Sequence, residues 1–247
     1  MDAILEICAD SFNSAKAAER GGAARIELCD NLSLGGTTPS YGVVKNVVEK
    51  LDIKCNVLIR PRVGDFVYSN DELNIMLDDI KLCKKLGVNG VVIGALTNDG
   101  DIDIDITRKM VAAAKNMEIT FHRAFDITRS PLQEIENLKS LGIDRLLTSG
   151  QRKTAFDGKE LIKQLVKKCG DVIIMPGSGI NSNNIADIAA FTGAKEFHTS
   201  AKKMALSNSK HRKVELLMGE ENGGSELRWS ESNEEIVRQI VLSLKNI

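Results

Sequence analysis

The sequence predicts a (β/α)8 barrel that forms a single domain over residues 1–247. Short β-branched segments alternate with longer amphipathic segments, and this alternation implies βαβ units with parallel strands. The length of 247 residues is close to the ~250 residues that eight such units usually occupy. Eight repeats within that length favour a closed barrel over an open sheet.

Eight segments have the composition of buried strands. They lie at residues 4–9, 25–29, 55–60, 89–94, 118–122, 144–149, 171–176 and 195–200. An open, doubly wound sheet is the alternative architecture. Because no glycine-rich dinucleotide fingerprint or P-loop follows the first segment, the barrel is preferred.

Helices are expected between these strands. In residues 71–86 the apolar side chains recur on one face, at Leu73, Met76, Leu77, Ile80 and Cys83. Ser130, Pro131 and Gln133 form a capping-box pattern with proline at the first helical position, and Gly142 is the expected end of that helix. Residues 201–232 are polar and predict a long loop, and residues 233–246 predict a C-terminal helix.

The composition excludes several classes of function. A net charge of -1 predicts no nucleic-acid partner, since no strongly basic face is implied. No apolar run reaches the ~18 residues that span a bilayer, and no secretory leader is recognisable, so we expect a cytoplasmic protein without a membrane partner. The five cysteines are odd in number and lack a Cys-x-x-Cys pair, which predicts reduced thiols.

The candidate site is placed where the strands end, because barrels of this kind bind ligands at the C-terminal ends of their strands. Glu6 and Glu27 stand inside otherwise apolar strands. A carboxylate cannot readily face the helix layer, so both side chains are expected to point into the upper barrel. Cys8 and Cys29 follow two residues later and share their faces.

Arg60 and Arg62 end the third strand and His122 ends the fifth, and all three are the expected counter-charges of these glutamates. His122 is also a candidate general acid or base, because histidine titrates near neutral pH. His198 is ranked lower, since its side chain is free to face the helix layer instead. The alternative interpretation of all these charges is a structural ion-pair cluster that plugs the barrel.

A glycine-rich turn, Gly177-Ser178-Gly179, follows the seventh strand and leads into a helix. Backbone N–H groups at such a turn can bind an anion, and the loops after strands seven and eight are the common phosphate site of these barrels. Ser200 would contribute from the eighth strand, and Ser149 from the sixth. A plain tight turn is the alternative.

Cys8 and Cys29 form a candidate metal site. Neighbouring strands are ~4.8 Å apart, so two thiolates with metal–sulfur bonds of roughly 2.3 Å could share one ion, and soft thiolates select Cu(I). The alternative is that both cysteines are buried as small hydrophobic residues.

Many short motifs, in order, resemble the copper homeostasis protein CutC family over about residues 4–201. They are EIC (6–8), RIELC (25–29), GGTTPS (35–40), IRPR (59–62), GDF (64–66), GALT (94–97), TFHRAFD (120–126), LTSG (147–150), PGSGI (176–180) and EFH (196–198). The resemblance implies a β/α barrel, a cytoplasmic location, a role in copper handling and a homo-oligomer, often a dimer. It also implies that Cys8 and Cys29 are the Cu(I) ligands. Ser178 departs mildly from the family pattern.

Two functions follow as hypotheses. The first is a copper homeostasis protein that binds Cu(I). The second is an enzyme that acts on a small anionic or phosphorylated metabolite at the barrel mouth. In the second, Glu6, Glu27 and His122 would move protons, and Arg60 and Arg62 would clamp the ligand or stabilise developing charge.

Overall fold

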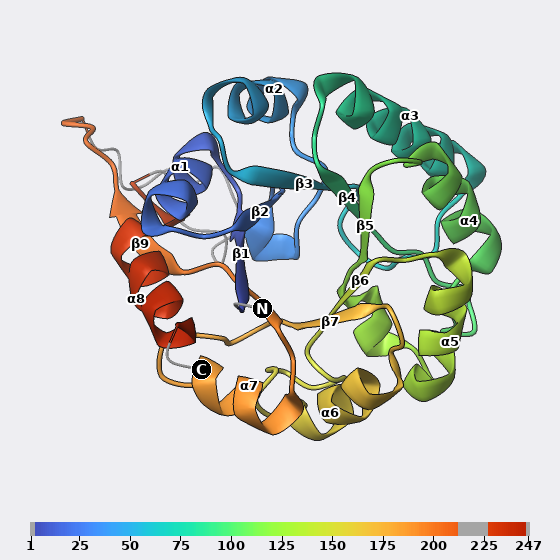
Figure 1. The fold of residues 1–247 in the computed structure, drawn as a ribbon. Coiled ribbons are helices and arrows are strands. Elements are labelled where there is room, and N and C mark those ends of the chain that lie inside the picture. The colour runs from blue at the N-terminus through green and yellow to red at the C-terminus, as the bar shows by residue number, and fades with distance from the viewer. Residues whose placement is uncertain (1–2, 212–226, 246–247) are drawn as a thin grey trace.

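The computed structural model describes residues 3–211 and 227–245, and it confirms the predicted barrel. Eight parallel strands pair in the order β7-β6-β5-β4-β3-β2-β1-β8. A parallel bridge between Gly177 and His198 joins β7 to β8 and closes the sheet. Helices form a ring around the strands (Figure 1). The described part of the chain is therefore a single-domain (β/α)8 barrel.

The barrel strands lie close to their predicted positions. They are β1 (Ile4–Ala9), β2 (Arg25–Leu28), β3 (Lys54–Leu58), β4 (Gly90–Ile93), β5 (Glu118–Phe121), β6 (Arg145–Thr148), β7 (Ile173–Pro176) and β8 (Glu196–Thr199). The outer helices are α1 (Phe12–Gly21), α2 (Tyr41–Lys50), α3 (Asn70–Leu86), α4 (Ile104–Ala113), α5 (Pro131–Leu141), α6 (Lys159–Lys168), α7 (Ile185–Thr192) and α8 (Glu234–Leu244). Short 3₁₀ helices follow β2 at Leu32–Leu34 and β5 at Arg123–Ile127.

The helix ends show where local sequence signals succeed and fail. α5 begins at Pro131 and ends before Gly142, whose φ of 73° is the left-handed conformation expected of a terminating glycine. The predicted capping box at Ser130 is wrong, because Ser130 has a ψ of 67° and its side chain makes no capping hydrogen bond. The capping box forms instead at α3, where Ser69 is extended (ψ 167°) and exchanges hydrogen bonds with Glu72.

The polar segment 201–232 is not a plain loop. Its two described ends pair as an antiparallel ribbon, β9 (Lys202–Leu206) with β10 (Arg228–Ser232), and residues 212–226 lie outside the described residues. The loop expectation failed at these ends because the polarity of the segment does not prevent its backbone groups from pairing with each other. Ser232 fastens the ribbon to the barrel through hydrogen bonds with Ser14 and with the backbone of Ser200.

α8 completes the ring of helices by packing against α1 and α7, as Figure 1 shows. Its buried face consists of Val237, Ile240 and Leu244. No helix in residues 3–211 and 227–245 combines the length and the apolar character that crossing a bilayer requires.

Alternation along each strand sorts the side chains into two environments. On β1, Leu5, Ile7 and Ala9 belong to the large hydrophobic core that joins the strands to the helices. Glu6 and Cys8 are also buried, but they point into the lumen and contact groups from other strands. The lumen is therefore polar, and its chemistry is determined by every second residue of the strands.

Candidate ligand site at the barrel mouth

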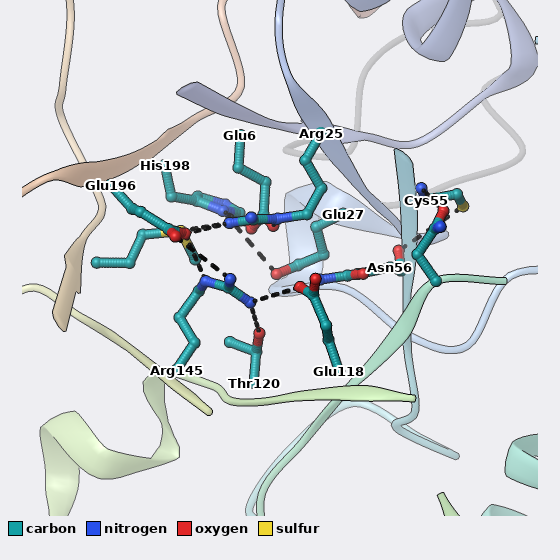
Figure 2. A network of polar contacts seen from close by, with 12 residues as sticks. Glu6, Arg25, Glu27, Cys55, Asn56, Glu118, Thr120, Arg145, Glu196 and His198 are labelled. Carbon is teal, nitrogen blue, oxygen red and sulfur yellow. Dashed lines mark hydrogen bonds and ion pairs between the residues drawn. The ribbon is translucent and has the colours of Figure 1, made fainter. Parts of the chain in front are cut away.

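The lower part of the lumen is an ion-pair network (Figure 2). Arg25 of β2 pairs with Glu6 and, at 2.6 Å, with Glu196 of β8. Arg145 of β6 reaches the same Glu196 oxygen at 2.5 Å and lies 3.3 Å from Glu118 of β5. Each pair joins adjacent strands or strands with one strand between them, and together the pairs form a chain of contacts inside the lumen that runs from β2 through β8 and β6 to β5. An ion-pair cluster therefore fills this level of the barrel, and of the residues considered for such a cluster from the sequence it contains Glu6 alone.

Glu6 is an interior carboxylate held by two cations. The strand register makes Arg25 and His198 its direct neighbours, and His198 Nδ1 lies 2.9 Å from Glu6 Oε1. Burial alone would raise the pKa of Glu6, but the hydrogen bonds and positive charges of His198 and Arg25 outweigh burial and lower it to about 2. Glu6 is 0% exposed and does not line the mouth cavity described below, so it positions other groups instead of meeting a ligand.

The counter-charges of the glutamates differ from the prediction. Glu6 pairs with Arg25 and His198, and none of Arg60, Arg62 and His122 contacts it. Arg62 points away from the lumen. It pairs with Asp65 in the loop after β3 and with Glu72 at the start of α3. His198, which we ranked lower because its side chain was free to face the helix layer, is buried in the lumen beside Glu6.

Above this network lies a cavity of about 330 Å³ at the C-terminal ends of the strands. Its acidic and thiol groups are Glu27 and Cys8, and its basic groups include Arg60, His122 and His198. A larger cavity of about 620 Å³ lies at the other end of the barrel, where alanine, leucine, valine, glycine and lysine residues line it. Of these two cavities, only the mouth cavity combines an acid, several bases and a thiol at the end of the barrel where such folds bind ligands, so we take it as the candidate site.

Glu27 has one engaged and one free carboxylate oxygen. Its Oε1 accepts a hydrogen bond from Cys8 Sγ at 3.5 Å. Its Oε2 is buried, lies 4.0 Å from His198 Nδ1 and has no hydrogen-bond partner among the described residues. Burial raises the pKa of Glu27. The positive charge of His198 lowers it, but by less, so the net shift is upward. Burial lowers the pKa of His198, but the charges of Glu27 and Glu6 outweigh it, and the net shift is upward.

Arg60 is a buried cation without an acidic partner. Its side chain donates to the backbone carbonyls of Gly36 at 2.8 Å and Gly64 at 2.6 Å, and its guanidinium lies 4.8 Å from the centre of the Phe66 ring. Within residues 3–211 and 227–245 no carboxylate lies within 4.0 Å of it, and its Nε has no hydrogen-bond partner. Arg60 is only 5% exposed, so its charge is buried without a carboxylate partner in the described part of the chain.

His122 is fixed as a neutral hydrogen-bond donor. Its Nδ1 accepts a hydrogen bond from the backbone N–H of Ala124 at 3.1 Å, which leaves the proton on Nε2. Burial and the nearby charge of Arg60 lower the pKa of His122 to about 3. Nε2 is buried without a partner among the described residues, and the ring lines the cavity. Gly94 provides the room for this ring, since a Cβ there would lie 2.3 Å from His122.

Part of the glycine-rich turn lies beside the mouth cavity. Ser178, Gly179 and Ser200 line the cavity, whereas Gly177 lies beneath it in the bridge that closes the barrel. Ser178 has a φ of 77°, a left-handed conformation that a non-glycine residue rarely adopts, and its hydroxyl donates to the carbonyl of Lys153 at 2.8 Å. The turn is thus held in a strained shape beside the cavity.

Ser149 does not reach the cavity. Its hydroxyl donates to Arg152 O at 2.6 Å and lies 2.9 Å from Asp126 and 2.8 Å from Arg123. Since Asp126 also accepts from the backbone N–H of Ser149, this serine organises the loop after β6.

Cys8 and Cys29 bring their sulfur atoms to 3.7 Å, and both are buried. A disulfide does not fit, because Cys8 is level with Glu27 and a two-residue offset separates the Cα atoms by ~8 Å. A shared ion does fit: bonds of roughly 2.3 Å would subtend an angle of roughly 107°. The angle is bent, which leaves room for a third ligand. The hydrogen bond with Cys29, burial and the neighbouring Glu27 all raise the pKa of Cys8, so its thiol is protonated without an ion.

Sequence reasoning missed the residues of the lower network: Arg25, Glu118, Arg145 and Glu196. The signal was present, because Arg25 precedes Glu27 by two residues and Glu196 precedes His198 by two, so each pair shares a strand face. The same alternation would have placed His198 in the lumen.

Fold and site together define the class of protein: a closed β/α barrel with an ion-pair network in the lower lumen and a small polar cavity at the mouth. The CutC family model matches residues 3–203, and the chain belongs to the CutC family. A family protein CutC of Parabacteroides distasonis is 49% identical over 98% of this chain and 100% of its own length. The human copper homeostasis protein cutC homolog is 44% identical over 99% of this chain and 90% of its own length.

Solved structures agree with this assignment. The putative copper homeostasis protein CutC from Streptococcus agalactiae has a TM-score of 0.77 and 34% identity, covering 80% of this chain and 98% of its own. Phosphoribosylanthranilate isomerase from Thermotoga maritima has a TM-score of 0.61 over 99% of this chain and 100% of its own, at 14% identity. At that identity the second likeness concerns the fold alone.

The depressed pKa of His122 predicts a loss of stability in mild acid. The unfolded side chain takes up a proton below pH ~6.5, whereas the folded one stays neutral down to about 3. The free energy of unfolding therefore falls as the pH drops through this window, by at most ~1.4 kcal/mol per pH unit for one group. In His122→Gln the fall between pH 7 and pH 5 should be smaller by ~1–2 kcal/mol, measured by urea denaturation.

His211→Gln, a change at an exposed histidine, is the matched control and should follow the parent protein at every pH. Parallel stability curves for His122→Gln and the parent would show that the buried ring is not held neutral.

Proposed function

We propose that the barrel mouth binds a small anionic metabolite, phosphorylated or carboxylated, and that the protein exchanges a proton with it. The observation that carries this proposal is Arg60, a buried guanidinium that lines the cavity and has no carboxylate partner in the described residues. An anion in the cavity would supply the missing counter-charge.

Further groups around the cavity support the proposal. His122 Nε2 is a second buried donor without a partner, suited to an oxygen atom of the ligand. Gly179 and Ser200 line the same cavity where barrels of this kind commonly bind phosphate. Glu27 Oε2 is the free oxygen that would exchange the proton, and Glu6 would hold His198 beside it.

Arg60 should control anion binding, and the adjacent Arg62 offers a matched control. Inorganic phosphate and glycerol 3-phosphate should stabilise the protein against heat and bind measurably by calorimetry. Arg60→Ala should weaken binding ~10–100-fold, since a hydrogen bond to a charged group contributes ~1.5–3 kcal/mol. Arg62→Ala, which removes an exposed arginine paired with Glu72, should change affinity less than ~2-fold.

Two results would count against the anion site. One is a parent protein that neither anion stabilises. The other is an equal loss of affinity in the two arginine variants, which would indicate a diffuse surface effect. Arg60→Lys keeps the positive charge but loses the forked guanidinium, which donates to the carbonyls of both Gly36 and Gly64. This variant therefore distinguishes the effect of the charge from the effect of the two loop contacts.

A second candidate function is Cu(I) binding at Cys8 and Cys29, in keeping with the copper homeostasis names of several relatives. The 3.7 Å separation of the two sulfur atoms favours it. A cytoplasmic location, where thiols stay reduced, belongs to this proposal, as does a homo-oligomer, with a dimer favoured.

Titration of the reduced protein with Cu(I) against a competing chelator tests the thiol pair. The double variant Cys8→Ser, Cys29→Ser should lose tight binding, because soft thiolates are the ligands that select Cu(I). The control is Cys55→Ser, Cys83→Ser, which changes two buried thiols whose pKa burial raises to about 12. Equal affinity in parent and double variant would remove the copper assignment at this pair.

A further inference from the structure

Three different metal-ligand types meet at the floor of the mouth cavity. Cys8, Glu27 and His198 each offer one ligand atom, and these atoms lie within 4.8 Å of one another. They come from β1, β2 and β8, which are neighbouring strands, and all three residues are buried. Cys29 does not belong to this group, although its sulfur lies 3.7 Å from that of Cys8.

The spacing of the thiol and the carboxylate suits a shared ion. Cys8 Sγ lies 3.5 Å from Glu27 Oε1. A tetrahedral Zn²⁺ with bonds of ~2.3 Å to sulfur and ~2.0 Å to oxygen separates two such ligands by ~3.5 Å. The observed distance between the two atoms therefore equals the distance expected if one Zn²⁺ ion bound both of them.

The imidazole of His198 is oriented as metal-binding histidines usually are. Its Nδ1 lies 2.9 Å from Glu6 Oε1, so the carboxylate of Glu6 accepts the Nδ1 proton. That contact leaves Nε2 available as a ligand atom, and a carboxylate behind the histidine is the common second contact at protein zinc sites. Glu6 is itself fixed by Arg25, which makes the orientation of the ring rigid.

A separate observation also indicates a cation. Glu27 Oε2 is buried without a hydrogen-bond partner among the described residues, and Glu27 is only 5% exposed. The nearby guanidinium of Arg25 is engaged by Glu6 and Glu196. The free oxygen thus has no hydrogen-bond donor in the described residues, with His198 Nδ1 4.0 Å away, at the point where the thiol and the imidazole converge.

We infer that Cys8, Glu27 and His198 form a binding site for a divalent transition-metal ion, for which Zn²⁺ is the best match. Three protein ligands of mixed sulfur, nitrogen and oxygen type leave a fourth position, which faces the mouth cavity that all three residues line. Carboxylate and imidazole ligands suit a divalent ion better than Cu(I), so the site differs from the thiol pair. The inference requires neither anion binding nor copper binding.

Co²⁺ provides a spectroscopic test, because it occupies zinc sites and its thiolate bond gives a charge-transfer absorption band. The reduced full-length protein is titrated with Co²⁺ under anaerobic conditions, and the bound ion is then displaced with Zn²⁺. The parent protein should develop the thiolate band at one equivalent. Cys8→Ser should abolish it, and Glu27→Gln and His198→Gln should each weaken Co²⁺ binding at least ~10-fold.

Cys29→Ser is the decisive control, since it changes the adjacent thiol and leaves all three proposed ligands in place. It should keep the band and the Co²⁺ affinity within ~2-fold. Glu6→Gln should weaken binding ~10–100-fold with the ligands intact, as loss of the contact behind a histidine does. Circular dichroism and thermal melting of each variant show whether a loss of Co²⁺ binding comes from the missing metal ligand or from unfolding of the protein.

Three outcomes would overturn the inference. The first is a parent protein that forms no thiolate band with Co²⁺. The second is a band that survives in Cys8→Ser, which would place the ion elsewhere. The third is a Cys29→Ser variant that loses as much affinity as Cys8→Ser while Glu27→Gln loses none, which would assign metal binding to the thiol pair.

Discussion

A charged side chain inside a closed barrel must find its partner inside the lumen, and the Arg25 pairs are the interaction on which this structure depends. Arg25 joins Glu6 to Glu196, and Glu196 also binds Arg145 of β6. Removing one partner would leave a buried charge uncompensated, at a typical cost of ~3–5 kcal/mol. The network therefore constrains β1, β2, β6 and β8 together.

The lumen changes character with height. At the base, arginines and carboxylates satisfy each other, and little capacity remains for a ligand. At the mouth, Glu27 Oε2, Arg60 Nε and His122 Nε2 are buried without hydrogen-bond partners in the described residues. Unpaired polar groups are costly, so they are expected where a ligand completes them. The ion-pair network at the base fixes Glu6, and Glu6 in turn fixes His198 through a hydrogen bond. The position of His198 at the mouth therefore does not depend on a contact with a ligand.

The strands were predictable because their signal is local. Composition and alternation placed all eight within two residues of their observed ends, as at 55–60 against Lys54–Leu58. The same alternation placed Glu6 and Glu27 in the lumen. It did not reveal their partners, since those depend on the register in which β1 pairs with β2 and with β8. Arg62 illustrates the limit: it lies two residues after Arg60, but the chain has left the strand there and the side chain turns to Glu72.

Other failures have equally specific causes. Ser149 has the position of a ligand-binding serine, yet the Asp126 carboxylate and the carbonyl of Arg152 occupy its hydroxyl. Cys8 and Cys29 were paired correctly as neighbours, and the contact of Cys8 with Glu27 became visible only in three dimensions. Hydrogen-bond satisfaction, which no sequence pattern reports, separates the groups available to a ligand from those already engaged.

The most direct test of this account is the free energy of unfolding of Glu196→Ala, measured by urea denaturation beside Glu49→Ala. Glu196 joins two buried arginines, whereas Glu49 forms an exposed pair with Lys45 on α2 at 3.9 Å. The account predicts a loss of ~3–5 kcal/mol for Glu196→Ala and of less than ~1 kcal/mol for Glu49→Ala. Equal and small losses would contradict the claim that the buried network supports the barrel and its mouth.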